Sequence, residues 1–198
     1  MSKSEQVAGA ESGPQEFTFE AFLAKLGTRD KLNVERVLAT AEAANKRHAE
    51  LWKKLATSLF ALSPHAVQTS GQQAVRFFLQ DGKYRLQCFA LEDQQDGKIC
   101  VYITDILAAA VKKKLVVEDD EAETEGDIVV YHLPKNEDAR IGIESLNAGN
   151  SGNAPEHYKH MLGWNRRALR LTIPHDATDA QMGVIVSLCA LARENTKS

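Results

Sequence analysis

The chain has few cysteines, and the three that it contains, Cys88, Cys100 and Cys189, lie far apart in its 198 residues. An odd number of cysteines without Cys-x-x-Cys spacing argues against a disulfide framework and against a zinc ribbon. The sequence also has no apolar run long enough to span a bilayer, and its first residues lack the apolar core of a signal peptide. We therefore expect a reduced, cytoplasmic protein without a membrane partner.

The sequence has no excess of positive charge. It contains 24 Lys and Arg residues against 27 Asp and Glu residues, which gives a net charge of −3. No global positive field therefore favours nucleic-acid binding, which stays possible only through local basic patches. Hydrophobic residues at 43% and charged residues at 26% are the balance of an ordinary globular protein rather than of a disordered one.

The order of helix and strand signals predicts three segments. Residues 1–15 are rich in Ser, Glu, Gln and Gly, which is typical of a disordered tail. Residues 16–63 are expected to be helical, with one long helix that begins near Asp30 or Asn33 and ends at about Leu62. Residues 64–198 are expected to form an α+β domain with one antiparallel sheet, a short helix at 106–114 and a buried C-terminal helix that opens with a capping box at residues 178–181.

The clearest strand signal is a meander of three strands at the start of the sheet. The dipeptide Asp81-Gly82 lies between two alternating stretches and is typical of a two-residue hairpin turn. That turn predicts a register in which Val75 lies opposite Cys88. The strands of the meander are expected at 74–80, 83–91 and 98–104, and later strands at 128–133, 141–146 and 165–173.

The predicted long helix carries apolar residues at alternating spacings of four and three, which is a heptad seam. A buried Asn in such a seam can fix the register and the oligomeric state. We therefore predict an interface with a helix of a second copy or of another protein. The alternative is that the helix packs along the sheet of its own domain. The predicted interface residues are Asn45, His48, Trp52, Leu55 and Leu59.

Two parts of the sequence combine arginine with aromatic residues. Guanidinium groups bind phosphate and carboxylate bidentately, and basic residues among aromatics on a sheet are typical of single-stranded nucleic-acid binding. We expect any anionic ligand to lie near the arginines of the 164–170 segment. The alternative is the ordinary solvated face of an antiparallel sheet. The candidate binding residues are Trp164, Arg166, Arg167 and Arg170, with Arg76, Arg85, Phe78 and Phe89 on the predicted outer sheet face.

The main candidate metal ligands are His157 and His160, three residues apart on a predicted helix. They lack the His-Glu-x-x-His form, and no carboxylate ligand is fixed by spacing. The acidic run at 118–127 lacks the ligand spacing of an EF-hand and is expected to be a solvated loop. We expect neither a metal nor a cofactor. No Gly-x-Ser-x-Gly elbow and no acid–base pair can be identified, so no catalytic residue is predicted.

These patterns favour a non-catalytic binding or adaptor protein that self-associates or docks a protein partner. The alternative is a ligand- or nucleic-acid-binding domain that uses the basic and aromatic sheet face and the segment from Trp164 to Arg170. The two differ in the surface that they use: the first needs the seam of the long helix, and the second needs accessible arginines.

Overall fold

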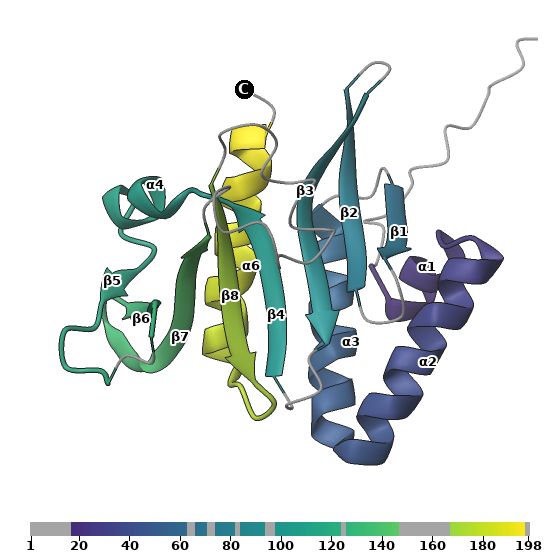
Figure 1. The fold of residues 1–198 in the computed structure, drawn as a ribbon, viewed down its shortest axis with the longest axis horizontal. Helices are drawn as coiled ribbons and strands as arrows, with labels where there is room; N and C mark the ends of the chain where they lie inside the picture. The colour runs from purple at the N-terminus through teal and green to yellow at the C-terminus, as the bar shows by residue number, and fades with distance from the viewer. Residues whose placement is uncertain are drawn as a thin grey trace, which may run out of the picture.

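The computed structural model describes residues 17–62, 66–70, 74–81, 84–93, 98–123, 126–146 and 167–196. Within these ranges the predicted α+β class is confirmed, with helices before the sheet and a helix after it (Figure 1). The predicted tail at 1–15 lies outside the described residues.

The described strands form one sheet in the order β1-β2-β3-β4-β8-β7-β6-β5, and all neighbours are antiparallel. The predicted strands correspond to β2, β3, β4, β6, β7 and β8, whereas β1 and β5 were not predicted. The bounds are β1 (Ala66–Ser70), β2 (Ala74–Asp81), β3 (Tyr84–Asp93), β4 (Lys98–Thr104), β5 (Val117–Glu118), β6 (Ile128–Leu133), β7 (Asn136–Leu146) and β8 (Ala168–Pro174).

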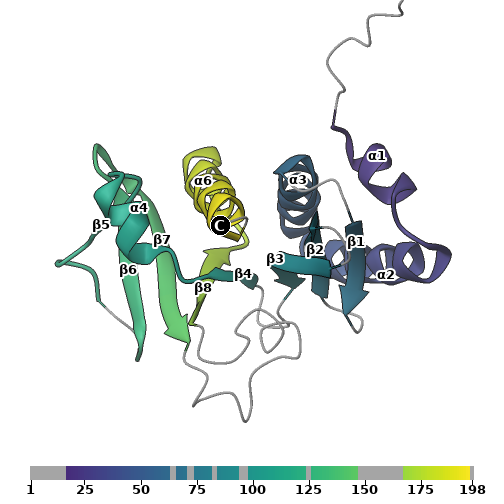
Figure 2. The same cartoon turned by 90° about the horizontal axis from the view of Figure 1, so that it is seen from above.

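The helices lie mainly on one face of the sheet, where α3 and α6 run side by side (Figure 2). Alternate residues of a strand point to opposite faces, so Ile99, Val101 and Ile103 of β4 are buried in the core beneath these helices. The bounds are α1 (Phe19–Ala24), α2 (Thr28–Ala44), α3 (Lys46–Leu62), α4 (Leu107–Lys112) and α6 (Asp179–Thr196).

The expectation of one continuous helix up to Leu62 is wrong, because the chain turns at Asn45 and forms the two helices α2 and α3. Asn45 has an extended backbone, and its Oδ1 accepts the backbone N–H of Arg47 at 3.0 Å and that of His48 at 3.4 Å. These bonds satisfy donors that the first turn of α3 leaves without an intrahelical partner. The residue predicted to fix a helix partner therefore begins a new helix instead.

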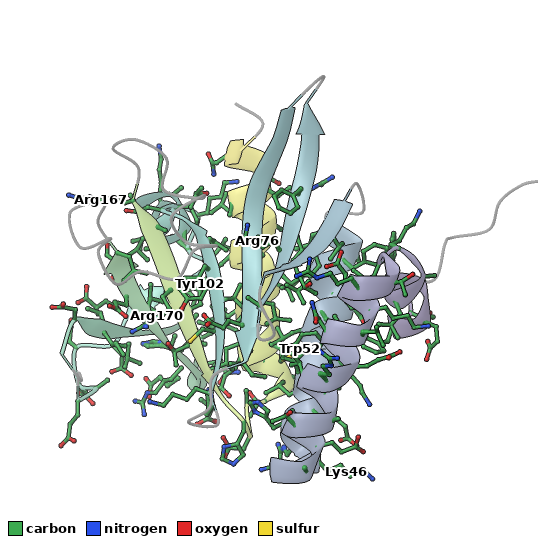
Figure 3. The ribbon with its side chains drawn as sticks, turned by 45° about the vertical axis from the view of Figure 1, so that its right-hand side comes forward. Lys46, Trp52, Arg76, Tyr102, Arg167 and Arg170 are labelled. Carbon is green, nitrogen blue, oxygen red and sulfur yellow. The ribbon has the colours of Figure 1, made fainter. Side chains whose placement is uncertain are left out.

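The predicted seam is buried within the chain itself. The apolar seam residues of α2 and α3 all belong to the hydrophobic core, and His48 is buried with them. Trp52 of α3 is fully buried (Figure 3). The structure thus accounts for the seam without a partner helix, as the alternative interpretation expected, and self-association by another surface stays a prediction. The buried seam residues are Val34, Leu38, Ala41, His48, Trp52, Leu55 and Leu59.

The predicted register of the first hairpin is also wrong. Val75 pairs with Leu91 instead of Cys88, Asp81 pairs with Tyr84, and a register shift occurs between Phe77 and Phe78. The extra residue in β3 is a β-bulge, which exchanges the faces of the residues beyond it. In this register the backbone of Phe89 pairs with that of Phe77, a core residue.

The last helix begins as predicted. Gln181 donates its backbone N–H to Thr178 Oγ1 at 3.2 Å, and Thr178 donates its own to Gln181 Oε1 at 2.8 Å. This reciprocal capping box opens α6, whose apolar residues are mostly buried against the sheet. None of the described helices is both long and apolar enough to cross a membrane.

The edge strand β1 is shielded by α2. Asp30 Oδ1 accepts the backbone N–H of Thr69 at 3.1 Å and its hydroxyl at 2.5 Å, and the Asn33 amide donates to Thr69 Oγ1 at 2.9 Å. A covered edge cannot readily pair with a strand of another chain. This edge is therefore a poor docking surface for an extended peptide.

Candidate functional site

The structure separates the predicted binding residues into different places. Arg76, Phe78 and Arg170 lie in strands, and Arg167 lies just before β8. Figure 3 shows Arg167 at the end of β8 and Arg170 further along the strand, so the two arginines do not form one cluster. Trp164, Arg166, His157 and His160, and the side chains of Arg85 and Phe89, lie outside the described residues.

Arg170 belongs to a row of polar side chains on the sheet face opposite α3 and α6. The register pairs Arg76 with Ala90, Ala90 with Tyr102, Tyr102 with Arg170, and Arg170 with Glu144. Directly opposite residues in antiparallel strands place their side chains on the same face. Glu92 lies two residues from Ala90 in β3, on the same face. We call the residues Arg76, Glu92, Tyr102, Arg170 and Glu144 the polar row.

Neighbouring residues of the polar row interact through their charges and hydrogen bonds. Burial raises the pKa of Tyr102 far above its usual value, and the charge of Glu92 and its hydrogen bond to the phenol raise it further. Burial acts to lower the pKa of Arg170, but the Glu144 carboxylate beside it and the contact with Tyr102 outweigh burial and raise it. Arg170 also forms an ion pair with Glu144. Tyr102 is thus held as a neutral phenol and Arg170 as a cation.

This arrangement weakens the nucleic-acid interpretation of the sheet face. The two arginines of the polar row are matched by two carboxylates, Glu92 and Glu144, so these four side chains carry no net charge. Tyr102 is also fully buried and offers no exposed ring for base stacking. The register places Arg76 on this face, and the acidic residues beside it were not considered in the sequence analysis.

Arg167 lies in a different environment, beside a cavity of about 460 Å³ between α4, the start of β8 and the end of α6. We call this cavity the α4–α6 depression. Its volume falls within the range of small-molecule sites. The residues of the wall include one cation, one carboxylate and one amide, together with small apolar residues. The lining residues are Thr104, Asp105, Ile106, Ala108, Ala109, Arg167 and Asn195.

Arg167 and Asp105 face each other across the end of the β4–β8 ladder. The Asp105 N–H donates to the Arg167 carbonyl at 3.1 Å, one residue beyond the pair of Thr104 with Ala168. Asp105 Oδ1 accepts the backbone N–H of Leu107 at 3.2 Å, which orients the carboxylate. Among the described residues, neither the Arg167 guanidinium nor the second Asp105 oxygen has a hydrogen-bond or ion-pair partner.

Thr104 also lines the depression, but strand alternation places its side chain on the face of Tyr102, opposite to the core face of Ile103. Its Oγ1 is buried and has no hydrogen-bond partner in the part of the chain that the structure describes. Because this atom has almost no accessible surface, it is not open to a ligand in the depression.

Comparisons with known protein families, with curated proteins and with solved structures find no match for this chain.

Sequence reasoning identified Arg167 but missed Thr104, Asp105 and Asn195. A signal for Asp105 existed, because this carboxylate directly follows a predicted strand and precedes a predicted helix, where functional side chains often lie. Asn195 lies about 90 residues later at the end of α6, so only the tertiary packing of the last helix brings it to Asp105. No local pattern reports such a contact.

The acidic run differs from the solvated loop that was expected, because Asp119 is buried. Arg140 Nε donates to Asp119 Oδ2 at 2.5 Å, and the Glu121 backbone N–H donates to Asp119 Oδ1 at 3.2 Å. Asp119 thereby ties the segment before β6 to β7. No group of three metal-ligating side chains able to hold an ion occurs among the described residues.

The Asp119 contacts predict a pH-dependent stability. Burial acts to raise the pKa of Asp119, but the hydrogen bonds from Arg140 and Glu121 outweigh it and lower the pKa below its usual value. A lowered folded-state pKa stabilises the protein above the unfolded-state value of about 3.9, and this stabilisation is lost as the pH falls through the folded-state pKa. The Tm advantage of the wild type over Asp119→Asn should therefore be largest near neutral pH and shrink below about pH 4.

Thermal unfolding followed by circular dichroism at several pH values checks this prediction. Asp120→Asn, an exposed neighbour in the same segment, controls for the loss of one negative charge. A Tm difference between wild type and Asp119→Asn that stays constant from neutral to acidic pH contradicts the structural role of the Asp119–Arg140 pair.

Proposed function

We propose that the protein is a non-catalytic binding protein and that its ligand is a small anion held by Arg167 in the α4–α6 depression. The observation that carries this proposal is the state of the Arg167 guanidinium, which lines a cavity and has no ion-pair partner among the described residues. A guanidinium group is always charged and presents several donors in a planar fork that fits a carboxylate or a phosphate.

Comparison with Arg170 supports the choice of Arg167. Arg170 is occupied by Glu144 and Tyr102, so a ligand anion would have to displace a partly buried carboxylate before it could bind. Arg167 needs no such exchange. The expectation that an anionic ligand lies near the arginines of this segment is therefore narrowed to Arg167.

The first interpretation of the sequence, docking of a partner helix on the seam, has lost its main support. The seam residues of α2 and α3 are used in the core, and the β1 edge is shielded by α2. Binding of a protein partner by another surface stays a prediction. Since the cavity is small and polar on one wall, a small molecule fits it better than a macromolecule does.

Titration calorimetry with inorganic phosphate and with butyrate tests the proposal. We expect saturable binding of at least one of these anions by the wild type, and a loss of about tenfold or more in affinity for Arg167→Gln, because a charge-assisted hydrogen bond is worth about 1.5–3 kcal/mol. Arg29→Gln, which removes an exposed arginine from α2, is the matched control and should bind like the wild type. Equal affinities of wild type and Arg167→Gln, or no binding of either anion, overturn the proposal.

A further inference from the structure

The carboxylate of Asp105 is the second charged group of the α4–α6 depression, and an anion-binding site does not need it. Asp105 and Arg167 occupy opposite positions at the end of two antiparallel strands. Cβ atoms at such positions lie about 4.5–5.5 Å apart, which is close enough for opposite charges to form an ion pair. The two side chains nevertheless form none.

The Asp105 side chain is held in place by its own local structure. Its Oδ1 accepts the N–H of Leu107, the first residue of α4, and this bond restricts the rotation of the carboxylate. The other oxygen remains available as an acceptor on the wall of the cavity. The wall therefore presents a cation and a carboxylate that are not paired with each other, and each can bind a group of opposite charge.

We infer that the natural ligand is a small zwitterion, an amino carboxylate whose carboxylate binds Arg167 and whose ammonium group binds Asp105. This inference rests on the proposed function, because it requires that Arg167 holds the anionic end. A ligand with both charges can bind the Arg167 guanidinium and the Asp105 carboxylate at the same time. A ligand with negative charge alone meets repulsion from Asp105, and an amine alone meets repulsion from Arg167.

The rest of the wall suits an amino carboxylate. The small apolar side chains of Ala108 and Ala109 leave room for a short aliphatic link between the two charged ends. The cavity volume of about 460 Å³ is ample for a molecule of amino-acid size.

Three probes of equal chain length separate the two charges: 4-aminobutyrate carries both, butyrate only the anion and butylamine only the cation. Titration calorimetry of the wild-type protein should give 4-aminobutyrate about tenfold higher affinity than butyrate, and butylamine the weakest binding. In Asp105→Asn, which keeps an oxygen for the Leu107 N–H, this preference for 4-aminobutyrate should disappear while butyrate binds at least as well as before. Asp120→Asn, an exposed carboxylate elsewhere, should keep the preference.

The outcomes distinguish this inference from the proposed function. If butyrate binds in an Arg167-dependent way but 4-aminobutyrate binds no better, or if its advantage survives in Asp105→Asn, the zwitterion inference is overturned and the anion site stands. If neither butyrate nor 4-aminobutyrate binds, the zwitterion inference is overturned, and if inorganic phosphate also fails to bind, the proposed function is overturned with it. Circular dichroism of each variant ensures that lost binding does not reflect lost folding.

Discussion

Leu55→Asp should fail to give a folded protein, whereas Leu32→Asp should fold like the wild type. Leu55 lies in α3 with 0% of its surface exposed, in the core that α2, α3 and the sheet share. Removing a buried leucine side chain costs about 2–5 kcal/mol, and burying an unpaired carboxylate adds several more. That sum is comparable with the whole stability of a typical domain, about 5–15 kcal/mol.

The control uses the same chemical change on the neighbouring helix. Leu32 in α2 is 49% exposed, so an aspartate there stays in contact with water. Far-UV circular dichroism and size-exclusion chromatography of the two variants decide the comparison. A Leu55→Asp protein that folds, and that differs from the wild type only in having lost a dimer, would contradict the fold and restore the partner-helix interpretation.

Arg170→Met should lower the free energy of unfolding by about 2–3 kcal/mol. The substitution leaves Glu144 without its cation, and the Glu144 side chain is only 16% exposed. Breaking a fully buried ion pair costs about 3–5 kcal/mol, and the 31% exposure of the Arg170 side chain moves the expected value below that range. Chemical denaturation with urea measures the change.

A double-mutant cycle separates the ion pair from packing. Adding Glu144→Gln to Arg170→Met removes the unpaired charge, so the double variant should recover more than half of the lost stability. Arg29→Met, which removes an exposed arginine, should cost little. If Arg170→Met is no more destabilising than Arg29→Met, the polar row is not a structural element of the sheet.

The fold class and most strands could be predicted because they depend on local patterns. The alternation along residues 98–104 and 128–133 identified β4 and β6, and the capping box at Thr178 fixed the start of α6. The two-residue strand β5 and the edge strand β1 could not be found in this way. The short β5 depends on its neighbour β6, and β1 packs against α2.

The main errors arose where a single residue changes the geometry. Asn45 preserves the seven-residue spacing of the apolar positions, so the pattern continues across a point where the helix does not. Asparagine is a preferred N-cap, and this preference was the available signal that α3 begins there. The β-bulge beside Phe77 and Phe78 left no comparable signal, because one extra residue in β3 is set by packing on the core.

The candidate site could be predicted only in part. Arg167 was identified from its residue type, but the sequence pattern did not distinguish it from Arg170. The difference between them comes from Glu144, which lies 26 residues earlier and opposite Arg170 on the neighbouring strand, and from the packing that places Arg167 beside Asp105 and Asn195. Such long-range pairs depend on the strand order, which local patterns do not report.

The most direct test of the binding site is a titration of the ¹⁵N-labelled wild-type protein with butyrate, followed by NMR spectra of the backbone amides and of the arginine Nε–H groups. A single ligand site in the α4–α6 depression predicts saturable shift changes concentrated at residues 104–109, at the Arg167 Nε–H and at Asn195. Shift changes that do not saturate, or that centre on Arg170 and the polar row while Arg167 stays unchanged, would contradict the site proposed here.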